Sequence, residues 1–245
     1  MLRLIAQVVM ALAVATLECF AGTSLKTPDE TSDESEPPKW EFSLEAATYL
    51  AQHSRDYVNP NFAADNDWLH LEARYNYEAL KTGSVWLGYN LHFDRELKFE
   101  TAPALNGPFD LKFTPMLGGV FGDVTGVAPG YALEINYNKI SFSTQGEYFD
   151  DAAVHAGDFF YTWSELSYSP ADWLWLGIVV DRTKVLGEKF DIRRGPLIGF
   201  KFNEHVDLTA YWLAPGSHEA TFVFAVALHW ERDSHLPHFS RSLRR

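Results

Sequence analysis

Two neighbouring segments, Trp68–Tyr77 and Val85–Phe93, alternate apolar and polar side chains with a period of two residues. Successive side chains of an extended chain point to opposite faces, so each segment has one apolar and one polar face. In the first segment the apolar face runs from Leu69 to Tyr77 at odd-numbered positions, and Trp68 falls on the other face with the polar residues. The polar break Lys81-Thr82-Gly83 lies between the segments, which predicts an antiparallel pair of strands joined by a turn.

The predicted strands are about ten residues long, whereas strands of soluble domains are usually about five or six residues long. An alternating strand of about 9–11 residues is long enough to cross a bilayer at a tilt. The pattern therefore favours a membrane-spanning strand pair whose apolar face meets lipid and whose polar face lines a lumen.

The N-terminus has the pattern of a secretory signal peptide. Arg3 precedes the almost wholly apolar segment Leu4–Leu17, and small residues lead to a cleavage site after Ala21. The apolar part of residues 1–21 is too short for a transmembrane helix. Glu18 disfavours lipid attachment at Cys19, because such signals need a small residue at that position. We therefore expect export through the inner membrane, after which the mature chain would have no thiol and no disulfide.

The charge and composition of the chain exclude some partners. The formal net charge of −13 argues against a nucleic-acid partner, which would need a basic patch. The mean hydropathy of −0.18 is low for a helical membrane protein, but a transmembrane barrel presents only every second side chain to lipid. The 8 Trp and 11 Tyr agree with the heavy use of amphipathic rings at membrane interfaces.

The alternation returns along the chain from Trp40 to Trp230, after an acidic Pro- and Ser-rich segment, 22–39, that we expect to be a disordered linker. Residues 40–231 are predicted to form an all-β, closed, antiparallel, up-and-down transmembrane barrel of about twelve strands. A basic C-terminal tail, 232–245, follows. Ten strands would result if Glu96–Ala102 and Leu111–Phe121 did not both span, because Pro115 and two glycines interrupt the second segment.

The predicted connections alternate in length. The even-numbered connections are short, whereas the odd-numbered ones are long and include Ala51–Asn66, Gly122–Gly130, Asp150–Asp158 and Val185–Ile192. Long external loops and short periplasmic turns are typical of outer-membrane barrels. Only the region Asp94–Asp110 departs from this rule.

The final predicted strand, Phe222–Trp230, alternates and ends on an aromatic residue, and it resembles the C-terminal assembly signal of bacterial outer-membrane barrels. It differs from that signal because Glu231–Arg245 follows it. In its overall pattern the chain resembles small Gram-negative outer-membrane β-barrels of the porin-like kind. This resemblance implies a location in the cell outer membrane, contact with the lipid bilayer, insertion by the barrel-assembly machinery and passage of a small solute.

The polar face supplies candidate lumen-lining residues, in which acidic side chains prevail: His70, Glu72, Arg74, Asn90, His92, Lys98, Glu100, Glu134, Glu147, Glu165, Asp181 and Lys201. Two kinds of lumen follow. In one the lumen is wet, and its acidic lining favours cations or neutral solutes over anions. In the other, carboxylates and basic side chains pair across the barrel and fill it. At about twelve strands we favour a narrow wet channel, since a barrel of about eight strands is just filled by its side chains.

Aromatic residues also fall on the predicted inner face, namely Trp86, Tyr161, Trp163, Trp173, Trp175 and Tyr211. They would either form a stacking surface for a solute or belong in part to an interfacial ring at the strand ends. We favour the second interpretation.

Signs of catalytic or metal chemistry are weak. There is no G-x-S-x-G motif, and His53-Ser54 is only half of a dyad. His235 and His238 supply too few ligands for a metal site, and Asp65-Asn66-Asp67 would need further oxygens to bind Ca²⁺. We therefore predict no enzyme activity and no cofactor. The leading hypothesis is a passive outer-membrane channel for small neutral or cationic solutes, with a closed structural or adhesion barrel and a lipid-modifying enzyme as alternatives.

Overall fold

The structure is a computed structural model that describes residues 39–52, 55–99, 101–102, 105–152 and 157–233. The predicted signal peptide, most of the predicted linker and tail, the pair His53-Ser54, and Glu100, His235 and His238 lie outside the described residues. Lys39, which was assigned to the linker, begins the first strand, and Arg232 and Asp233, which were assigned to the tail, end the last one.

All the regular elements of the described residues are strands, and none of these residues forms a helix long and apolar enough to cross a membrane. The thirteen strands, in chain order, are β1 Lys39–Ala51, β2 Tyr57–Asn66, β3 Leu69–Tyr75, β4 Thr82–Tyr89, β5 Leu91–Leu97, β6 Gly107–Gly122, β7 Gly126–Tyr137, β8 Ile140–Asp151, β9 Phe159–Ala171, β10 Leu174–Val185, β11 Asp191–Asn203, β12 Val206–Leu213 and β13 Thr221–Asp233.

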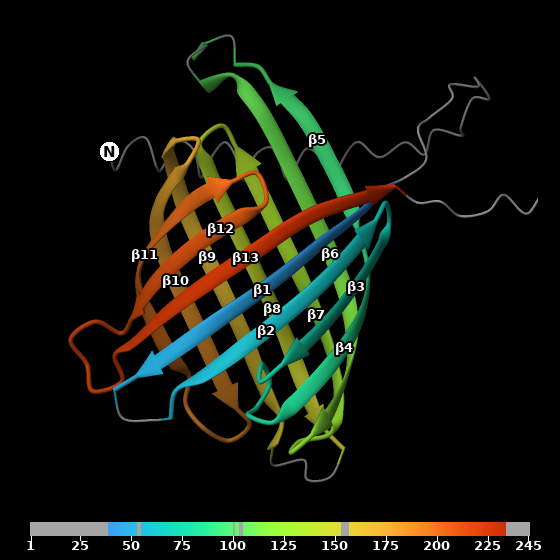
Figure 1. Cartoon of the computed structure of the whole chain (residues 1–245), viewed down its shortest axis with the longest axis vertical. Helices are drawn as coiled ribbons and strands as arrows, with labels where there is room; N and C mark the ends of the chain where they lie inside the picture. Colours follow the sequence, from blue (N-terminus) through green and yellow to red (C-terminus); the bar gives the residue numbers. More distant parts are fainter. Residues whose placement is uncertain (1–38, 53–54, 100, 103–104, 153–156, 234–245) are drawn as a thin grey trace, which may run out of the picture. The chain divides into compact units, whose positions relative to one another are not determined.

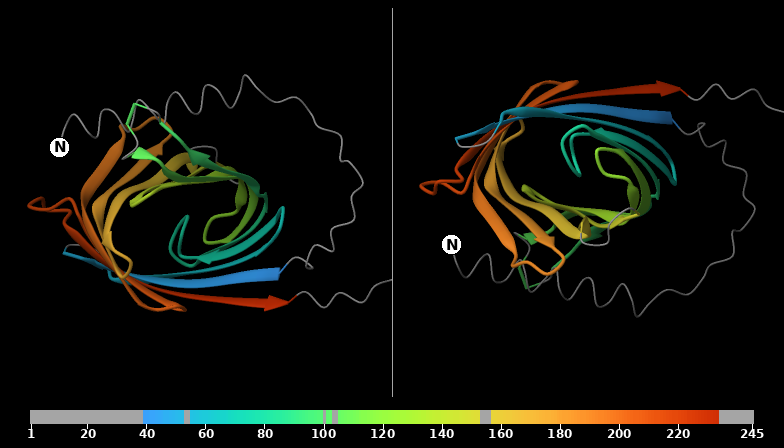
Figure 2. Two further views of the ribbon diagram at one scale, coloured as in Figure 1. Left: turned by 90° about the horizontal axis from the view of Figure 1, so that it is seen from above. Right: turned by 90° about the horizontal axis from the view of Figure 1, so that it is seen from below.

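The strands form one closed antiparallel sheet. Sequential neighbours pair from β6 to β13, β13 pairs with β1, and β1 to β4 continue the ring until β4 pairs with β6. Because β4 and β5 lie one after the other along β6, the thirteen strands make a barrel of twelve. Figure 1 shows the tilted strands of this barrel, and Figure 2 shows them enclosing a lumen. The predicted fold class is confirmed.

The break between β4 and β5 is explained by one proline. Gly88 pairs with Met116, Leu91 pairs with Phe113, and the register is the same on both sides of the break. Pro115 lies opposite the break and has no N–H group to donate to a ladder, so pairing stops there. Beyond the break β5 pairs only with β6, and this hairpin projects from the barrel in Figure 1.

The number of barrel strands was predicted correctly, but two strand assignments were wrong. The segment Ala51–Asn66, predicted as a long loop, contains β2, and Glu96–Ala102 is no separate strand but the end of β5 and the connection after it. The two errors offset each other in the count. Pro60 obscures β2 in the sequence, yet it lies beyond the β2–β3 ladder and pairs only with Ala46 of β1, where its missing N–H costs little.

The two ends of the barrel differ in their connections. We call the end at which β1 begins and β13 ends the terminal end, and the opposite end the far end. Two-residue turns at Asp67-Trp68, Asn138-Lys139, Asp172-Trp173 and Glu204-His205 lie at the terminal end. Asp67 and Asn138 adopt positive φ angles of 52° and 54°, which their short polar side chains tolerate better than most residues. The predicted asymmetry of connections is present in most of the barrel, and the connection between β5 and β6 remains an exception. The segment Ala79–Gly83, predicted as one of the short even-numbered turns, belongs instead to the far end, because the missed strand β2 shifts the numbering of the connections by one.

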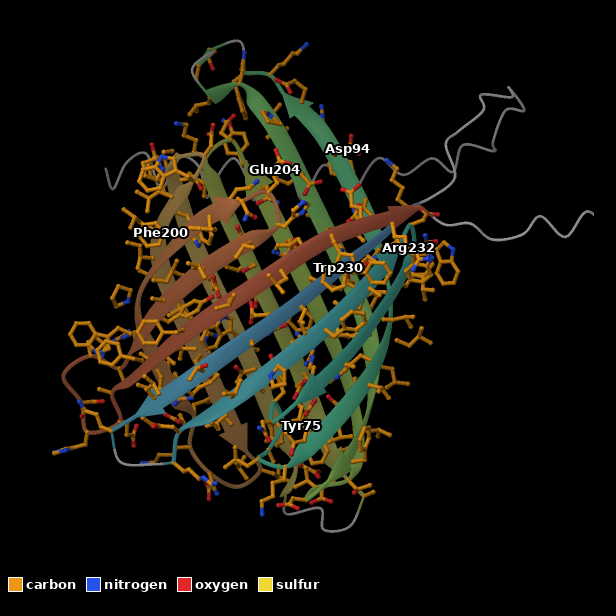
Figure 3. All side chains as sticks on the ribbon, in the orientation of Figure 1. Tyr75, Asp94, Phe200, Glu204, Trp230 and Arg232 are labelled. Atoms are coloured by element: carbon orange, nitrogen blue, oxygen red, sulfur yellow. The ribbon has the colours of Figure 1, made fainter. Side chains whose placement is uncertain are left out.

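The outer surface of the barrel is apolar over many strands. Exposed side chains include Leu87, Leu117, Ile178, Phe224 and Val226, and in water so many exposed apolar groups would drive association. Aromatic side chains of this surface include Tyr75 at the end of β3 and Trp230 near the end of β13, both labelled in Figure 3. An apolar band bordered by aromatic rings is the surface of a membrane-spanning barrel. The chain is therefore a barrel of the outer membrane.

Alternation places Trp68 and Trp173 on the polar face, but both belong to this outer surface, which for Trp173 agrees with the favoured interpretation of an interfacial ring. Both lie in terminal-end turns, where the alternation of the strands does not apply. Trp68 stacks on Tyr89 and is 51% exposed, and Trp173 stacks on Phe200 and is 56% exposed.

Candidate functional site

The lumen is partly filled by two apolar clusters on different walls. The first joins inward side chains of β1 and β10 to β13, among them Val179, Leu213 and Val223. The second joins inward side chains of β4 and β6 to β8, among them Trp86 and Phe149. These clusters narrow the interior, so polar groups and open space are confined to what remains.

Arg74 on β3 forms the centre of a buried ionic network. Its Nη2 donates to Glu72 Oε2 at 2.7 Å, and its Nη1 donates to Glu147 Oε2 on β8, four strands farther round the ring, at 3.0 Å. The guanidinium carbon also lies 4.4 Å from the ring centres of both Tyr77 and Trp86. Arg74 is 5% exposed, so both the charge pairing and the ring contacts act in a region of low dielectric.

The network continues toward the terminal end through His70. His70 Nδ1 lies 2.9 Å from Asp65 Oδ1, and its Nε2 lies 3.5 Å from Glu72 Oε2. Asp65 also accepts from Asn90 Nδ2 at 2.6 Å and pairs with Lys112 at 3.4 Å. Side chains of β2, β3, β4–β5, β6 and β8 are thus joined in one polar network along one wall.

Open space remains on the other side of the lumen as three cavities in series. The terminal-end cavity has a volume of about 630 Å³ and is lined by Glu41, Ser43, Asp65, Glu204, His205, His229 and Glu231, with Phe42 and Trp230 at its edge. Ser43 and His229 also line the next cavity, so the two volumes share a wall.

The central cavity has a volume of about 280 Å³ and lies against β1, β2, β7 to β9, β12 and β13. Three carboxylates line it, those of Glu45, Glu134 and Glu165. Glu165 Oε1 accepts from Trp163 Nε1 at 2.6 Å, but within the described ranges none of the three carboxylates pairs with a basic side chain. The central cavity is therefore acidic.

The far-end cavity has a volume of about 270 Å³ and is bounded by tyrosines and by charged groups of β3–β4, β10 and β11. Tyr49, Asn59, Tyr77 and Tyr161 line both this cavity and the central one. These four side chains therefore lie at the boundary that the two cavities share. Asp181 of the far-end cavity is paired with Arg193.

Most of the predicted lumen residues on the strands of the barrel wall lie inside it. His70, Glu72, Arg74, Asn90 and Glu147 belong to the polar network, and Glu134, Glu165 and Asp181 line cavities. Three others are exposed at or beyond the terminal end, namely His92 on β5, Lys98 after β5 and Lys201 near the end of β11. Glu100 lies outside the described residues.

Tyr77 was predicted on the lipid face and lies inside. β3 ends at Tyr75, and Asn76 then takes a positive φ of 59°, which ends the alternation and turns the chain inward. The residues of β2 that face the lumen, including Asn59 and Asn61, were missed because the strand itself was missed. A weak alternation of Val58 and Phe62 with these asparagines was the available signal.

Two of the inward tryptophans pack against glycines of the barrel wall, and a third lines a cavity. Trp86 lies against Gly118, its partner across the ladder, where an added Cβ would be 2.6 Å from the ring. Trp175 likewise covers its cross-strand partner Gly199, where no Cβ would fit. Trp163 packs edge-on against Tyr211 at 5.3 Å and lines the central cavity.

The segment Asp65-Asn66-Asp67, considered for Ca²⁺, contributes to the polar network. Asp65 and Asn66, predicted in a loop, belong to β2, and Asp65 is held by His70, Asn90 and Lys112. Within the ranges that the structure describes, no group of three or more His, Cys, Asp or Glu side chains could hold a metal ion.

No family model and no curated protein matches the chain. Solved structures that resemble it include a KdgM porin, with 9% identity, a TM-score of 0.49, and coverage of 76% of this chain and 98% of that one. Omp33 of Acinetobacter baumannii has 9% identity, a TM-score of 0.43 and coverage of 78% and 99%. The CymD monoaromatic hydrocarbon channel has 9% identity, a TM-score of 0.34 and coverage of 83% and 90%. With identities of 9% and TM-scores below 0.5, these resemblances say nothing about the function of this chain.

The solved structures that resemble this chain are outer-membrane barrels, as the sequence pattern indicated. The closed ring of twelve strands, the apolar outer band and the polar interior all agree with that architecture. The chain is a closed antiparallel β-barrel of twelve strands whose outer surface is that of a membrane-spanning barrel.

Proposed function

We propose that the protein is an outer-membrane channel that passes small neutral or cationic solutes by passive diffusion. The observation that carries this proposal is the series of three cavities, each sharing lining residues with the next. The series runs from the terminal-end rim, where Glu204 and His205 lie, to the far-end connections, where Tyr57 and Val185 lie. A solute would pass through these cavities. The wall beside them, which carries the Arg74 network and the apolar cluster around Trp86 and Phe149, is called the filled wall.

The lining of the series supports a preference for cations over anions. Carboxylates occur in all three cavities, as Glu41, Glu165 and Asp181 illustrate, and the basic Arg193 is paired. Rings of acidic side chains favour cations in narrow pores. The volumes of the central and far-end cavities, about 280 and 270 Å³, suit a solute of small size.

The direction of the barrel follows from its even strand number. Both chain ends of an even-stranded barrel lie on one side, which in bacterial outer membranes is the periplasmic side. In this proposal the far-end cavity opens to the outside and the terminal-end cavity opens to the periplasm. The protein is a passive conduit in this account and not an enzyme.

Planar-bilayer recording of the folded full-length protein tests the proposal. We expect a conductance above that of the bare bilayer. In a KCl gradient, we expect a reversal potential whose sign shows that K⁺ is more permeant than Cl⁻. Folding is checked by heat-modifiable mobility in gels. A correctly folded barrel without conductance would contradict the channel function.

A specific observation favours a second candidate, a closed structural or adhesion barrel. The network around Arg74 and the two apolar clusters fill much of the lumen, as the pairing model predicts. This candidate predicts that the cavities stay isolated and that neither ions nor neutral solutes pass. Swelling of liposomes that contain the protein, in isotonic sugar of small size, separates the two candidates.

A further inference from the structure

The far-end cavity contains buried oxygen acceptors that lack donors. Asn59 is 8% exposed and Asp181 is 2% exposed, and the Oδ1 atom of each has no hydrogen-bond partner among the described residues. Both oxygens of Glu78 are buried and unpartnered as well. All three residues line the cavity, and a buried acceptor without a donor costs about 1–3 kcal/mol.

The same cavity is walled by aromatic rings. Tyr49, Tyr57, Tyr77 and Tyr161 line it. Tyr49 stacks on Tyr57 with ring centres 4.6 Å apart, and Tyr77 meets Tyr161 edge-on with ring centres 5.4 Å apart. The faces of tyrosine rings attract cations that come within about 6 Å of the ring centre.

The charges of the cavity leave an excess of negative charge. Glu78 and Asp181 contribute two carboxylates, and the guanidinium of Arg193 pairs with Asp181. Glu78 has no basic partner in the described part of the chain. A cation that entered the cavity would therefore meet one uncompensated carboxylate, free acceptor oxygens and aromatic faces.

We propose that the far-end cavity is a binding site for a small organic ammonium ion. The N–H or polarised C–H groups of such an ion would meet Glu78, Asn59 and the free oxygen of Asp181, and its alkyl groups would lie against the tyrosines. A hard metal ion prefers a shell of oxygen ligands alone and gains little from such rings. The volume of about 270 Å³ suits a small molecule rather than a bare ion.

This inference rests on the proposed function, because it names the cationic solute that the channel would admit at its outer mouth. It places selection outside the boundary with the central cavity, where Tyr49, Asn59, Tyr77 and Tyr161 lie. Ions that pass this point would reach the acidic central cavity.

Titration calorimetry of the folded full-length protein in detergent, with tetramethylammonium chloride as the probe, tests the site. KCl at the same ionic strength is the reference. We expect a saturable heat for tetramethylammonium and none for KCl. Glu78→Gln removes the unpaired charge without breaking an ion pair and should weaken binding about tenfold.

A matched pair of variants separates the ring from the hydroxyl. Tyr57 lies at the start of β2, where replacement disturbs little of the barrel, and its ring stacks on Tyr49. Tyr57→Phe keeps the aromatic face and should bind as the unchanged protein does, whereas Tyr57→Leu should bind several-fold more weakly. Gel mobility confirms that each variant is folded.

Absence of a saturable tetramethylammonium heat in the folded, unchanged protein would overturn the site, as would an equal heat from KCl. Equal binding by Tyr57→Leu and Tyr57→Phe would overturn the aromatic part of the proposal. Bilayer conductance of the same protein preparation is measured as well, so that channel function and tetramethylammonium binding are tested independently. A conducting channel without tetramethylammonium binding would refute this inference and leave the proposed function standing.

Discussion

Arg74 is the side chain on which the filled wall depends. It neutralises Glu72 and Glu147 from two different strands while its guanidinium lies near the rings of Tyr77 and Trp86. Glu147 Oε1 and Arg74 Nε have no partner among the described residues, so the pairing is complete in charge but not in hydrogen bonds. Removing the guanidinium would leave the buried carboxylates of Glu72 and Glu147 without their shared cationic partner.

Arg74→Leu is expected to destabilise the barrel by about 3–5 kcal/mol, the usual cost of breaking a buried pair. Glu147→Gln should cost much less, because Arg74 keeps Glu72 and the amide still accepts a hydrogen bond. Urea unfolding in detergent or lipid vesicles measures both changes. If Arg74→Leu unfolded at the same urea concentration as the unchanged protein, the network would not contribute to stability.

At the scale of the strands, neighbouring backbones are covered by large rings. Trp175 of β10 lies over Gly199 of β11, and Trp86 of β4 lies over Gly118 of β6. In both pairs the glycine is the cross-strand partner of the tryptophan, so the ring can lie flat along the wall instead of across the lumen. This arrangement leaves room for the central cavity.

Gly199→Val should cost about 1–3 kcal/mol of unfolding free energy, because its side chain would meet the Trp175 ring. Trp175→Ala should cost about 3–5 kcal/mol through loss of packing. The double variant should be more stable than the sum of the two losses predicts, since the added valine then has space. Strictly additive losses in a double-mutant cycle would show that the two residues do not interact in this way.

The sequence predicted strands well wherever the two faces of a strand differ strongly, as in Val206–Trp212 and Phe222–Trp230. It failed at β2, where Pro60 and a run of small residues blur the contrast between faces. It also failed at Trp68 and Tyr77, because turn geometry and not alternation decides where these rings point. The ion pairs could not be predicted, since Arg74 and Glu147 come together only when the barrel closes.

At the scale of the whole molecule, closure by the β4–β6 pairing fixes the direction of every connection. The connection that contains Glu188 lies at the far end, and His205 lies in a turn at the terminal end. The proposed direction in the membrane places the first outside the cell and the second in the periplasm.

A membrane-impermeant maleimide applied to intact cells should therefore label Glu188→Cys and not His205→Cys. Both positions are exposed on the protein, so the difference in labelling would come from the membrane and not from burial. The unchanged protein serves as the control, because any labelling of it would come from Cys19. The opposite labelling would show that the barrel is inserted the other way round.

In the proposed channel, solutes pass through the three cavities and not between the packed side chains of the filled wall. Ala225 and Ala128 are matched probes, since both are buried and face the lumen, but only Ala225 lines the central cavity. In a bilayer recording, a small cationic thiosulfonate added to Ala225→Cys should reduce the current, and the same reagent should leave the current of Ala128→Cys unchanged. An unchanged current in Ala225→Cys, with the modification verified by mass spectrometry, would contradict the account.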